Sequence, residues 1–182
     1  MSEETAAVFT ALYDVVYDDV LRYVTRRLHP DGAGAEDVVA EAMTTAWRRR
    51  RDLPRELDDA RAWVFGIARG CLLNDARSRR RRTALGVRLA SIEGGAVSED
   101  GADLAISRAD LARAWSRLSD DQQDVLSLAV FEGLDSARAG RVLSISAAAY
   151  RVRLARARSA LRHDLDVDSR AGSIRPLYEE TR

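Results

Sequence analysis

The spacing of apolar residues predicts a chain built from helices. Across residues 5–28 the apolar side chains recur every three to four positions, which places them on one face of a helix. A second such pattern begins near Ala35, and a third covers residues 58–82. Turn-forming residues separate the three segments, at 29–32 and again at Leu53-Pro54. Strand-like runs are scarce, so the expected fold class is all-α.

The helical pattern stops and then resumes, which indicates two domains. Residues 83–103 have little periodicity and contain Glu93-Gly94-Gly95, as is typical of a linker. Apolar residues return to a helical spacing from Leu104, and Ser119 with Gln122 has the form of a capping box that opens a further helix. We therefore expect two small helical domains joined by a flexible linker. The expected boundaries are 1–82, 83–103 and 104–165, with residues 166–182 as a C-terminal tail.

The second domain contains the pattern of a helix-turn-helix. Asp135 is placed to cap a short helix that ends at Leu143, residues 144–146 form a tight turn, and Ser146 is placed to cap a long helix running to about Asp164. Gly140 is the small residue expected where the two helices cross.

The long helix of this motif has an apolar back and an arginine-rich front. Tyr150, Leu154 and Ala157 share the face expected to pack inward. Small residues at the start of such a helix and arginines along it suit the DNA major groove, because arginine binds phosphates and guanine edges with two parallel hydrogen bonds. The competing interpretation is a solvated helix with incidental arginines. The candidate DNA-contacting residues are Ala148, Ala149, Arg151, Val152, Arg153, Arg156, Arg158 and Arg162.

Composition limits the alternatives. The formal net charge is +0, although all 29 basic residues are arginines, so their distribution and not the overall charge indicates a nucleic-acid partner. The chain has one cysteine, Cys71, inside an apolar helical run, which favours a buried thiol. Only two histidines occur, and no metal-ligand spacing, nucleophile motif or phosphate-binding glycine loop is found. We expect neither enzymatic activity nor a cofactor, and no membrane insertion.

Two separate sets of motifs resemble those of one protein family. Residues 120–126, which begin Asp-Asp-Gln-Gln, together with 131–134 and 143–158, resemble sigma region 4. Residues 35–48, which begin Ala-Glu-Asp-Val-Val-Ala-Glu, resemble region 2.2, and 61–69 with Asn74-Asp75 resemble regions 2.3 and 2.4. In order and spacing, the chain from about Phe9 to Leu165 resembles the extracytoplasmic-function (ECF) sigma factors of RNA polymerase.

The acidic start Met1-Ser2-Glu3-Glu4 lacks a signal-peptide pattern and no apolar run has the length of a membrane span, so a cytoplasmic protein is expected. The resemblance implies that it binds core RNA polymerase and promoter DNA, with an anti-sigma factor as a candidate third partner. Region 2.2 docks on a coiled coil of the largest polymerase subunit in this family, and region 4 recognises the minus-35 element. Regions 2.3 and 2.4 open and recognise the minus-10 element, helped by a loop at residues 52–59. The polymerase-docking candidates in or beneath the surface are Asp37, Glu41, Met43 and Trp47. The minus-10 candidates are Arg61, Arg69, Asn74, Arg77 and Arg80.

Three places depart from the family pattern. Ala40 stands where the family usually has glutamine, so one polymerase contact is expected to be missing. Ser144 stands where glycine is frequent, so the turn needs a solution without glycine. The recognition helix has Ala148-Ala149-Tyr150-Arg151 where the family often has Gly-Thr-Val-Lys, so the minus-35 preference cannot be carried over from the family.

Two other functions stay open at this point. The first is a regulator that binds DNA through its C-terminal helix-turn-helix alone, with residues 1–82 as a sensor or dimerisation domain. The second is an all-α hydrolase that uses carboxylates such as Asp37 and Glu41, although the scarcity of histidine argues against it.

Overall fold

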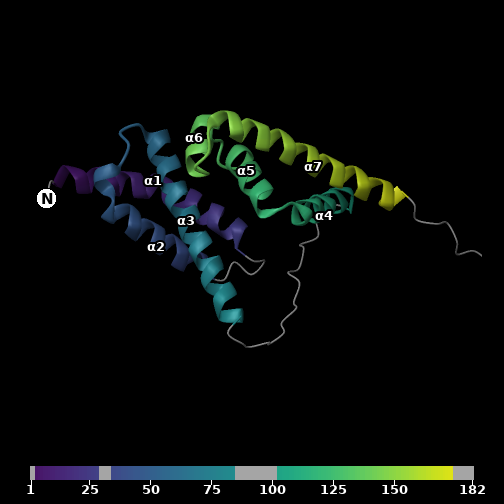
Figure 1. Cartoon of the computed structure of the whole chain (residues 1–182), viewed down its shortest axis with the longest axis horizontal. Coiled ribbons are helices and arrows are strands. Elements are labelled where there is room, and N and C mark those ends of the chain that lie inside the picture. Colours follow the sequence, from purple (N-terminus) through teal and green to yellow (C-terminus); the bar gives the residue numbers. More distant parts are fainter. Residues whose placement is uncertain (1–2, 29–33, 85–101, 174–182) are drawn as a thin grey trace, which may run out of the picture.

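All regular elements are helical in the part of the chain that the structure, a computed structural model, describes: residues 3–28, 34–84 and 102–173. The elements, drawn in Figure 1, are α1 (Glu3–Arg27), α2 (Ala35–Arg48), a 3₁₀ turn η1 (Arg50–Asp52), α3 (Leu57–Ala84), α4 (Ala102–Arg117), α5 (Asp120–Val130), α6 (Ser136–Val142) and α7 (Ala147–Ser173). The predicted all-α class is thereby confirmed. Most of the predicted linker and the end of the predicted tail, residues 85–101 and 174–182, lie outside the described residues.

The last helix is longer than the sequence pattern predicted. We expected it to end near Asp164, but α7 continues to Ser173. Extending an existing helix by one residue fixes one backbone unit and adds one hydrogen bond, so a helix tends to continue until a breaker intervenes. The next such residue is Gly172, and there is no proline before Pro176.

Helices α1, α2 and α3 pack into the first domain. The predicted inward face of α1 is confirmed, since Val16, Val20 and Tyr23 are fully buried. They meet α3 at Phe65, whose ring stands edge-on to Tyr23 with 5.4 Å between the ring centres. Cys71 of α3 is buried, and burial, followed by the charge of Glu41, raises the pKa of its thiol to about 11. The thiol therefore stays protonated at neutral pH, in agreement with the predicted structural role.

Helices α4 to α7 form the second domain. The predicted capping box is confirmed, because Ser119 Oγ accepts from the backbone N–H of Gln122 while the Gln122 side chain accepts from the N–H of Ser119. α7 lies across α4, α5 and α6 (Figure 1) and anchors to α5 through Tyr150, whose hydroxyl donates to the carbonyl oxygen of Val125 at 2.8 Å. Burial raises the pKa of Tyr150 to about 12, so this donor keeps its proton.

The two domains also contact each other. α6 of the second domain packs against α3 of the first, and buried residues such as Leu128 and Val142 belong to the same apolar cluster as Val16 and Phe65. The two domains are therefore in direct contact as well as being joined by the chain between them.

Candidate nucleic-acid interface

The helix-turn-helix comprises α6, residues 143–146 and the start of α7. Asp135 caps α6 by accepting from the backbone N–H groups of Ala137 and Arg138, and the hydrogen bond from Arg138 is the main reason that the pKa of Asp135 is lowered. Ser146 Oγ accepts from the N–H of Ala149 at 3.1 Å, so both predicted caps are confirmed. These caps fix where each helix begins.

Gly140 lies where the two helices cross, as predicted. A β-carbon placed there would lie 2.8 Å from the carbonyl oxygen of Ile145, with the backbone of Ser146 and Ala147 at 3.3 Å. Because all three neighbours are backbone atoms, only glycine fits without displacing the turn.

Ser144 solves the turn without glycine by adopting a left-handed conformation, with φ of 56°. Polar residues with short side chains tolerate this region better than β-branched or bulky residues do. The backbone N–H of Ile145 then reaches the carbonyl oxygen of Gly140 at 2.9 Å and closes the turn.

The recognition helix α7 buries the face that the sequence predicted. Tyr150 and Ala157 are 1% and 0% exposed, while Leu154 between them and Leu161 one turn beyond are half-buried. All five candidate arginines of this helix are exposed, as are Ala148 and Val152, while Ala149 is half-buried.

The exposed side of α7 has a strip of small residues between two rows of arginines. At about 100° per residue, Ala148, Val152, Ala155 and Ser159 fall opposite the buried face. The arginines divide into two rows, one on each edge of this strip. One row is Arg151, Arg158 and Arg162, and the other is Arg153 and Arg156. Such a helix can approach the floor of the major groove with its small residues while both edges meet a phosphate backbone.

On the first domain, the polymerase-docking candidates of α2 form two groups that differ in exposure. Asp37 and Glu41 are exposed one turn apart, so both carboxylates can reach a partner. Met43 is 7% exposed and belongs to the core, and the half-buried Trp47 ring packs edge-on to Phe9 at 5.2 Å. Met43 and Trp47 therefore lie beneath the surface and shape it from within.

The minus-10 candidates lie along α3, and some are ion-paired within the protein while others are exposed. Arg61 and Arg69 are ion-paired with carboxylates of other helices, Arg61 with Asp19 at 2.7 Å and Arg69 with Asp124 at 3.0 Å. Asn74 and Arg77 are exposed and hydrogen-bond to each other at 3.2 Å, so their outer faces are accessible.

Two further expectations concern the ends of α3. The side chain of Arg80 lies outside the described residues. The loop expected at residues 52–59 is partly helical, because η1 includes Asp52 and α3 begins at Leu57.

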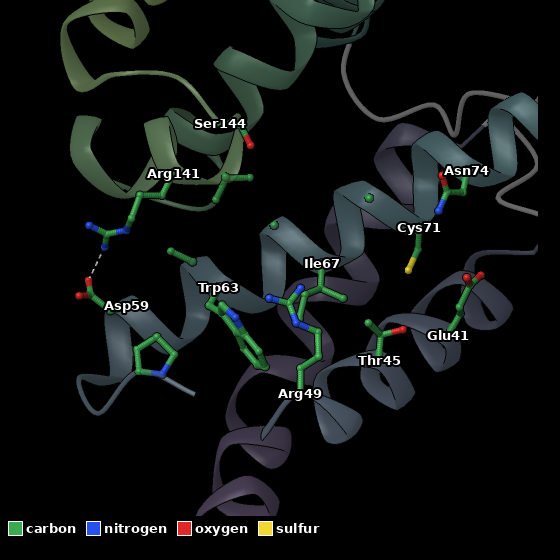
Figure 2. Close-up of a pocket in the computed structure, with 15 residues that line it drawn as sticks. Glu41, Thr45, Arg49, Asp59, Trp63, Ile67, Cys71, Asn74, Arg141 and Ser144 are labelled. Carbon is green, nitrogen blue, oxygen red and sulfur yellow. Dashed lines mark hydrogen bonds and ion pairs between the residues drawn. The ribbon is translucent and has the colours of Figure 1, made fainter. Parts of the chain in front are cut away.

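A cleft of about 570 Å³ lies between the two domains and brings several of these residues together. Figure 2 shows Glu41, Cys71 and Asn74 of the first domain on one side and Arg141 and Ser144 on the other. Residues predicted for polymerase docking and for minus-10 recognition thus line the same cleft as the helix-turn-helix.

Sequence reasoning missed the acidic residues that hold the arginines. Asp19, Asp59 and Asp124 each bind an arginine far away in the sequence. Of the three, only Asp124 could have been found from the sequence. The helical period places it beside Val125 and Leu128 on the buried side of the helix, and a buried charge needs a partner. Its partners follow only from the packing of the domains.

Neither a metal site nor a membrane helix is found within the described ranges. No three His, Cys, Asp or Glu side chains there are grouped to hold an ion, and no helix there has the length and apolar character needed to span a bilayer.

These features define a helix-turn-helix DNA-binding protein with a second helical domain. Comparison with known proteins identifies both parts, since residues 12–82 match Sigma-70 region 2 and residues 108–161 match Sigma-70 region 4. The ECF RNA polymerase sigma factor SigL of Mycobacterium tuberculosis is 32% identical over 157 residues, which cover 86% of this chain and 88% of SigL. The ECF sigma factor BldN of Streptomyces coelicolor is 32% identical over 167 residues, 91% of this chain and 63% of BldN.

Solved structures show the same fold. The sigma factor RpoE from Bartonella quintana, determined in complex with the anti-sigma factor NepR, superposes with a TM-score of 0.67 at 24% identity over 88% of this chain and 98% of that one.

The chain belongs to the ECF sigma factors, with sigma-70 regions 2 and 4. It directs RNA polymerase to promoters, and its partners are the core enzyme and promoter DNA. The family is not enzymatic, so the predicted absence of catalysis is confirmed and the hydrolase alternative is excluded. Membership of the family also excludes the alternative of a regulator that works without polymerase.

Proposed function

We propose that the second domain, residues 104–165, selects the minus-35 element through α7, and that the first domain, residues 1–82, docks on the polymerase and recognises the minus-10 element. The observation that carries the first part is the strip of small residues on α7 between its two rows of exposed arginines. Ala148 and Val152 face the groove floor, where apolar contact with thymine methyl groups is available, and the arginine rows bind phosphates on both sides.

Position along the helix divides the arginines by role. Arg151 is near the N-terminal end of α7, where helix-turn-helix proteins contact base edges. Arg162 lies three turns further on, and its Nε donates to the carbonyl oxygen of Arg158 at 3.3 Å. This hydrogen bond keeps the Arg162 side chain along the edge of the helix, where a DNA phosphate would lie. We assign base recognition to Arg151 and phosphate binding to Arg162.

Promoter binding by holoenzyme over a randomised minus-35 element, at two salt concentrations, tests this assignment. Arg151→Ala is expected to lose about 1–3 kcal/mol of discrimination at one base pair. Arg162→Ala is expected to weaken all sequences equally and to reduce the salt slope by about one. If both variants weaken all sequences alike, Arg151 is a phosphate contact and the small strip alone carries specificity. If neither has an effect, α7 does not enter the groove.

On the first domain, Asp37 and Glu41 are the polymerase contacts, supported by their exposure on one face of α2. Asn74 and Arg77 contact the minus-10 strand directly, because both are exposed on α3. Arg61 and Arg69 contribute there once their ion pairs with Asp19 and Asp124 open. The protein works in the cytoplasm, where its polymerase is.

An anti-sigma factor is the candidate regulator, in line with the complex of RpoE from Bartonella quintana with the anti-sigma factor NepR. Supporting it is an apolar groove of the second domain, with Leu111, Val130 and Phe131 at 46%, 62% and 51% exposure. Exposed apolar surface of this kind marks protein-binding sites. An inhibitor that uses the groove should no longer block transcription by Val130→Arg holoenzyme, whereas unchanged inhibition would place its site elsewhere.

A further inference from the structure

The orientation of α7 about its own axis decides which of its side chains can meet the floor of a DNA groove. Ala148 and Val152 lie at the centre of the exposed strip, and Arg151 lies on its edge. Successive residues of a helix differ by about 100°, so a roll of about 60° would bring an arginine row to the place of the small residues. Recognition by α7 therefore requires a contact that fixes this roll.

Most of the buried side of α7 is aliphatic. Ala157 is buried against α4 and α5, and Leu154 and Leu161 are half-buried beside it. Hydrophobic contact has no preferred direction, and aliphatic side chains can adapt to a small rotation of the helix. These residues hold α7 on the domain more strongly than they define its angle.

Tyr150 differs from these residues because it makes a directional bond. Its side chain is 1% exposed, and its hydroxyl donates to the carbonyl oxygen of Val125 on α5 at 2.8 Å. Val125 lies within α5, where its oxygen also serves the helix, and the second lone pair of that oxygen is available to the hydroxyl. Hydrogen bonds weaken steeply when they bend, so this one ties a defined point of α7 to a defined point of α5.

The same position is one of those at which this chain departs from the family pattern. Tyr150 stands where valine is frequent, and valine has no hydroxyl. The bond to Val125 is thus a feature of this chain's own sequence.

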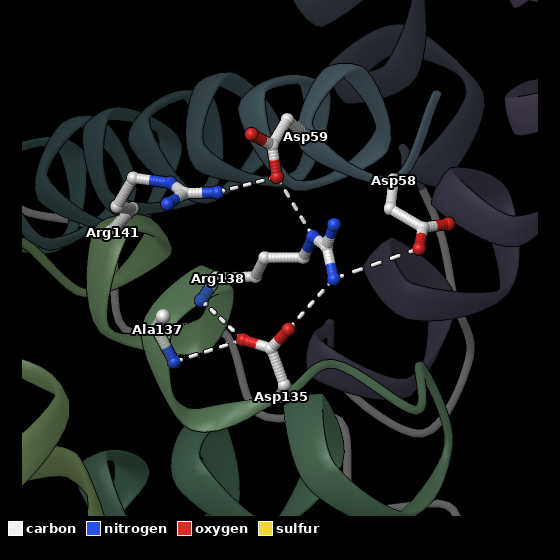
Figure 3. A network of polar contacts seen from close by, with 6 residues as sticks. All are labelled: Asp58, Asp59, Asp135, Ala137, Arg138 and Arg141. Carbon is white, nitrogen blue, oxygen red and sulfur yellow. Dashed lines mark hydrogen bonds and ion pairs between the residues drawn. The ribbon is translucent and has the colours of Figure 1, made fainter. Parts of the chain in front are cut away.

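The rest of the motif supplies a rigid frame for this bond. Figure 3 shows Asp135 at the start of α6 accepting from the backbone N–H groups of Ala137 and Arg138 and from the Arg138 guanidinium. Near the other end of α6, the β-carbon position of Gly140 is 3.3 Å from the backbone nitrogen of Ala147, the first residue of α7. This crossing is one fixed point of α7, and the Tyr150 hydroxyl is a second point one turn further on.

We propose that Tyr150 is a positioning residue for promoter recognition, whose hydroxyl, bonded to Val125, aims Arg151 at the minus-35 bases. Arg151 is the next residue of the same helical turn, so the roll that Tyr150 fixes is the roll that directs Arg151. Tyr150 is buried and acts only through its neighbour. The inference rests on the proposed role of α7 in selecting the minus-35 element.

The test measures promoter binding by holoenzyme that contains the full-length chain. The binding constants for the preferred minus-35 sequence and for a randomised one are compared at two salt concentrations. Tyr150→Phe removes the hydroxyl and keeps the ring, and Tyr150→para-aminophenylalanine restores a donor on the same ring. The matched control is Tyr23→Phe, because the Tyr23 hydroxyl is also buried but has no hydrogen-bond partner among the described residues.

Tyr150→Phe is expected to reduce the ratio of the two binding constants by about two- to tenfold, the range that the net contribution of one hydrogen bond sets. The salt dependence should stay unchanged, because no phosphate contact is lost. The para-amino ring should restore the ratio, and Tyr23→Phe should leave it at the wild-type value. A merely structural role would not give this result, since partial unfolding lowers both binding constants equally and leaves their ratio unchanged.

Three outcomes would overturn the proposal. A wild-type ratio in Tyr150→Phe, together with a reduced ratio in Arg151→Ala, would mean that α7 recognises bases without needing the hydroxyl. A loss that the para-amino ring does not restore would assign the effect to packing of the ring. If Arg151→Ala also keeps the wild-type ratio, base recognition by Arg151 fails and this inference fails with it, so the two failures are distinguished by the arginine variant.

Discussion

Replacing Gly140 by alanine tests the geometry of the helix-turn-helix with a single methyl group. In most helices this change stabilises, because alanine exceeds glycine in helix propensity by about 0.8–1.0 kcal/mol. Here the new β-carbon would lie 2.8 Å from the carbonyl oxygen of Ile145, closer than such atoms approach each other in proteins. The turn has to move, and its hydrogen bond from the Ile145 N–H to the Gly140 oxygen moves with it.

The expected magnitude follows from these two opposing effects. Forcing one methyl into a packed site costs typically about 1–3 kcal/mol, and close contact with three backbone atoms of the turn favours the upper part of that range. Subtracting the propensity gain leaves a destabilisation of roughly 1–2 kcal/mol for Gly140→Ala. For a chain of this size the melting temperature should fall by about 2–4 °C per kcal/mol.

The assay is thermal and urea unfolding followed by far-ultraviolet circular dichroism, with Gly70→Ala as the matched control. A β-carbon on Gly70 meets nothing within 4 Å, so Gly70→Ala is expected to stabilise by about 0.5–1 kcal/mol. Opposite signs for the two alanines support the geometry. If Gly140→Ala stabilises as Gly70→Ala does, the close crossing of α6 and α7 is wrong.

Three further outcomes are expected. Ser144→Gly should raise the free energy of unfolding, measured in urea, by roughly 0.5 kcal/mol, because relief of the strained left-handed φ exceeds the extra entropy of glycine in the unfolded chain. A loss of stability would mean that the Ser144 side chain makes a stabilising contact. Ser119→Ala should lower the free energy of unfolding by about 1 kcal/mol in the same assay, because it removes the side-chain cap of α5. Ser119→Asp should keep most of the wild-type stability, since aspartate can also cap a helix. Equal stability of all three proteins would refute the cap. The double variant Asp37→Arg with Glu41→Arg should keep the wild-type melting temperature yet bind core polymerase at least about tenfold more weakly, because two charged contacts are lost. Co-purification with core at the wild-type level would show that this face of α2 does not contact the polymerase.

Local signals in the sequence were sufficient for the helices and for the recognition motif. The inward positions Val16, Val20 and Tyr150 followed from the helical period, since burial of one face is a property of each helix separately. The capping box at Ser119 and the crossing at Gly140 also depend on neighbours within a few residues. The end of α7 did not follow, because a helix continues past weak signals until a breaker stops it.

The partners of the charged side chains were decided only by the tertiary structure. Nothing near Arg69 in the sequence predicts that it meets Asp124, and the two lie 55 positions apart. Likewise Arg138 and Asp59 are 79 positions apart, on different domains. The sequence predicted Arg69 as a DNA contact, whereas the packing of the second domain on the first brings Asp124 of α5 against it in a protein contact. Charge patterns determine what a side chain can bind, but the docking of distant surfaces determines what it does bind, because Coulomb attraction between side chains acts over a few ångströms of space and not along the chain.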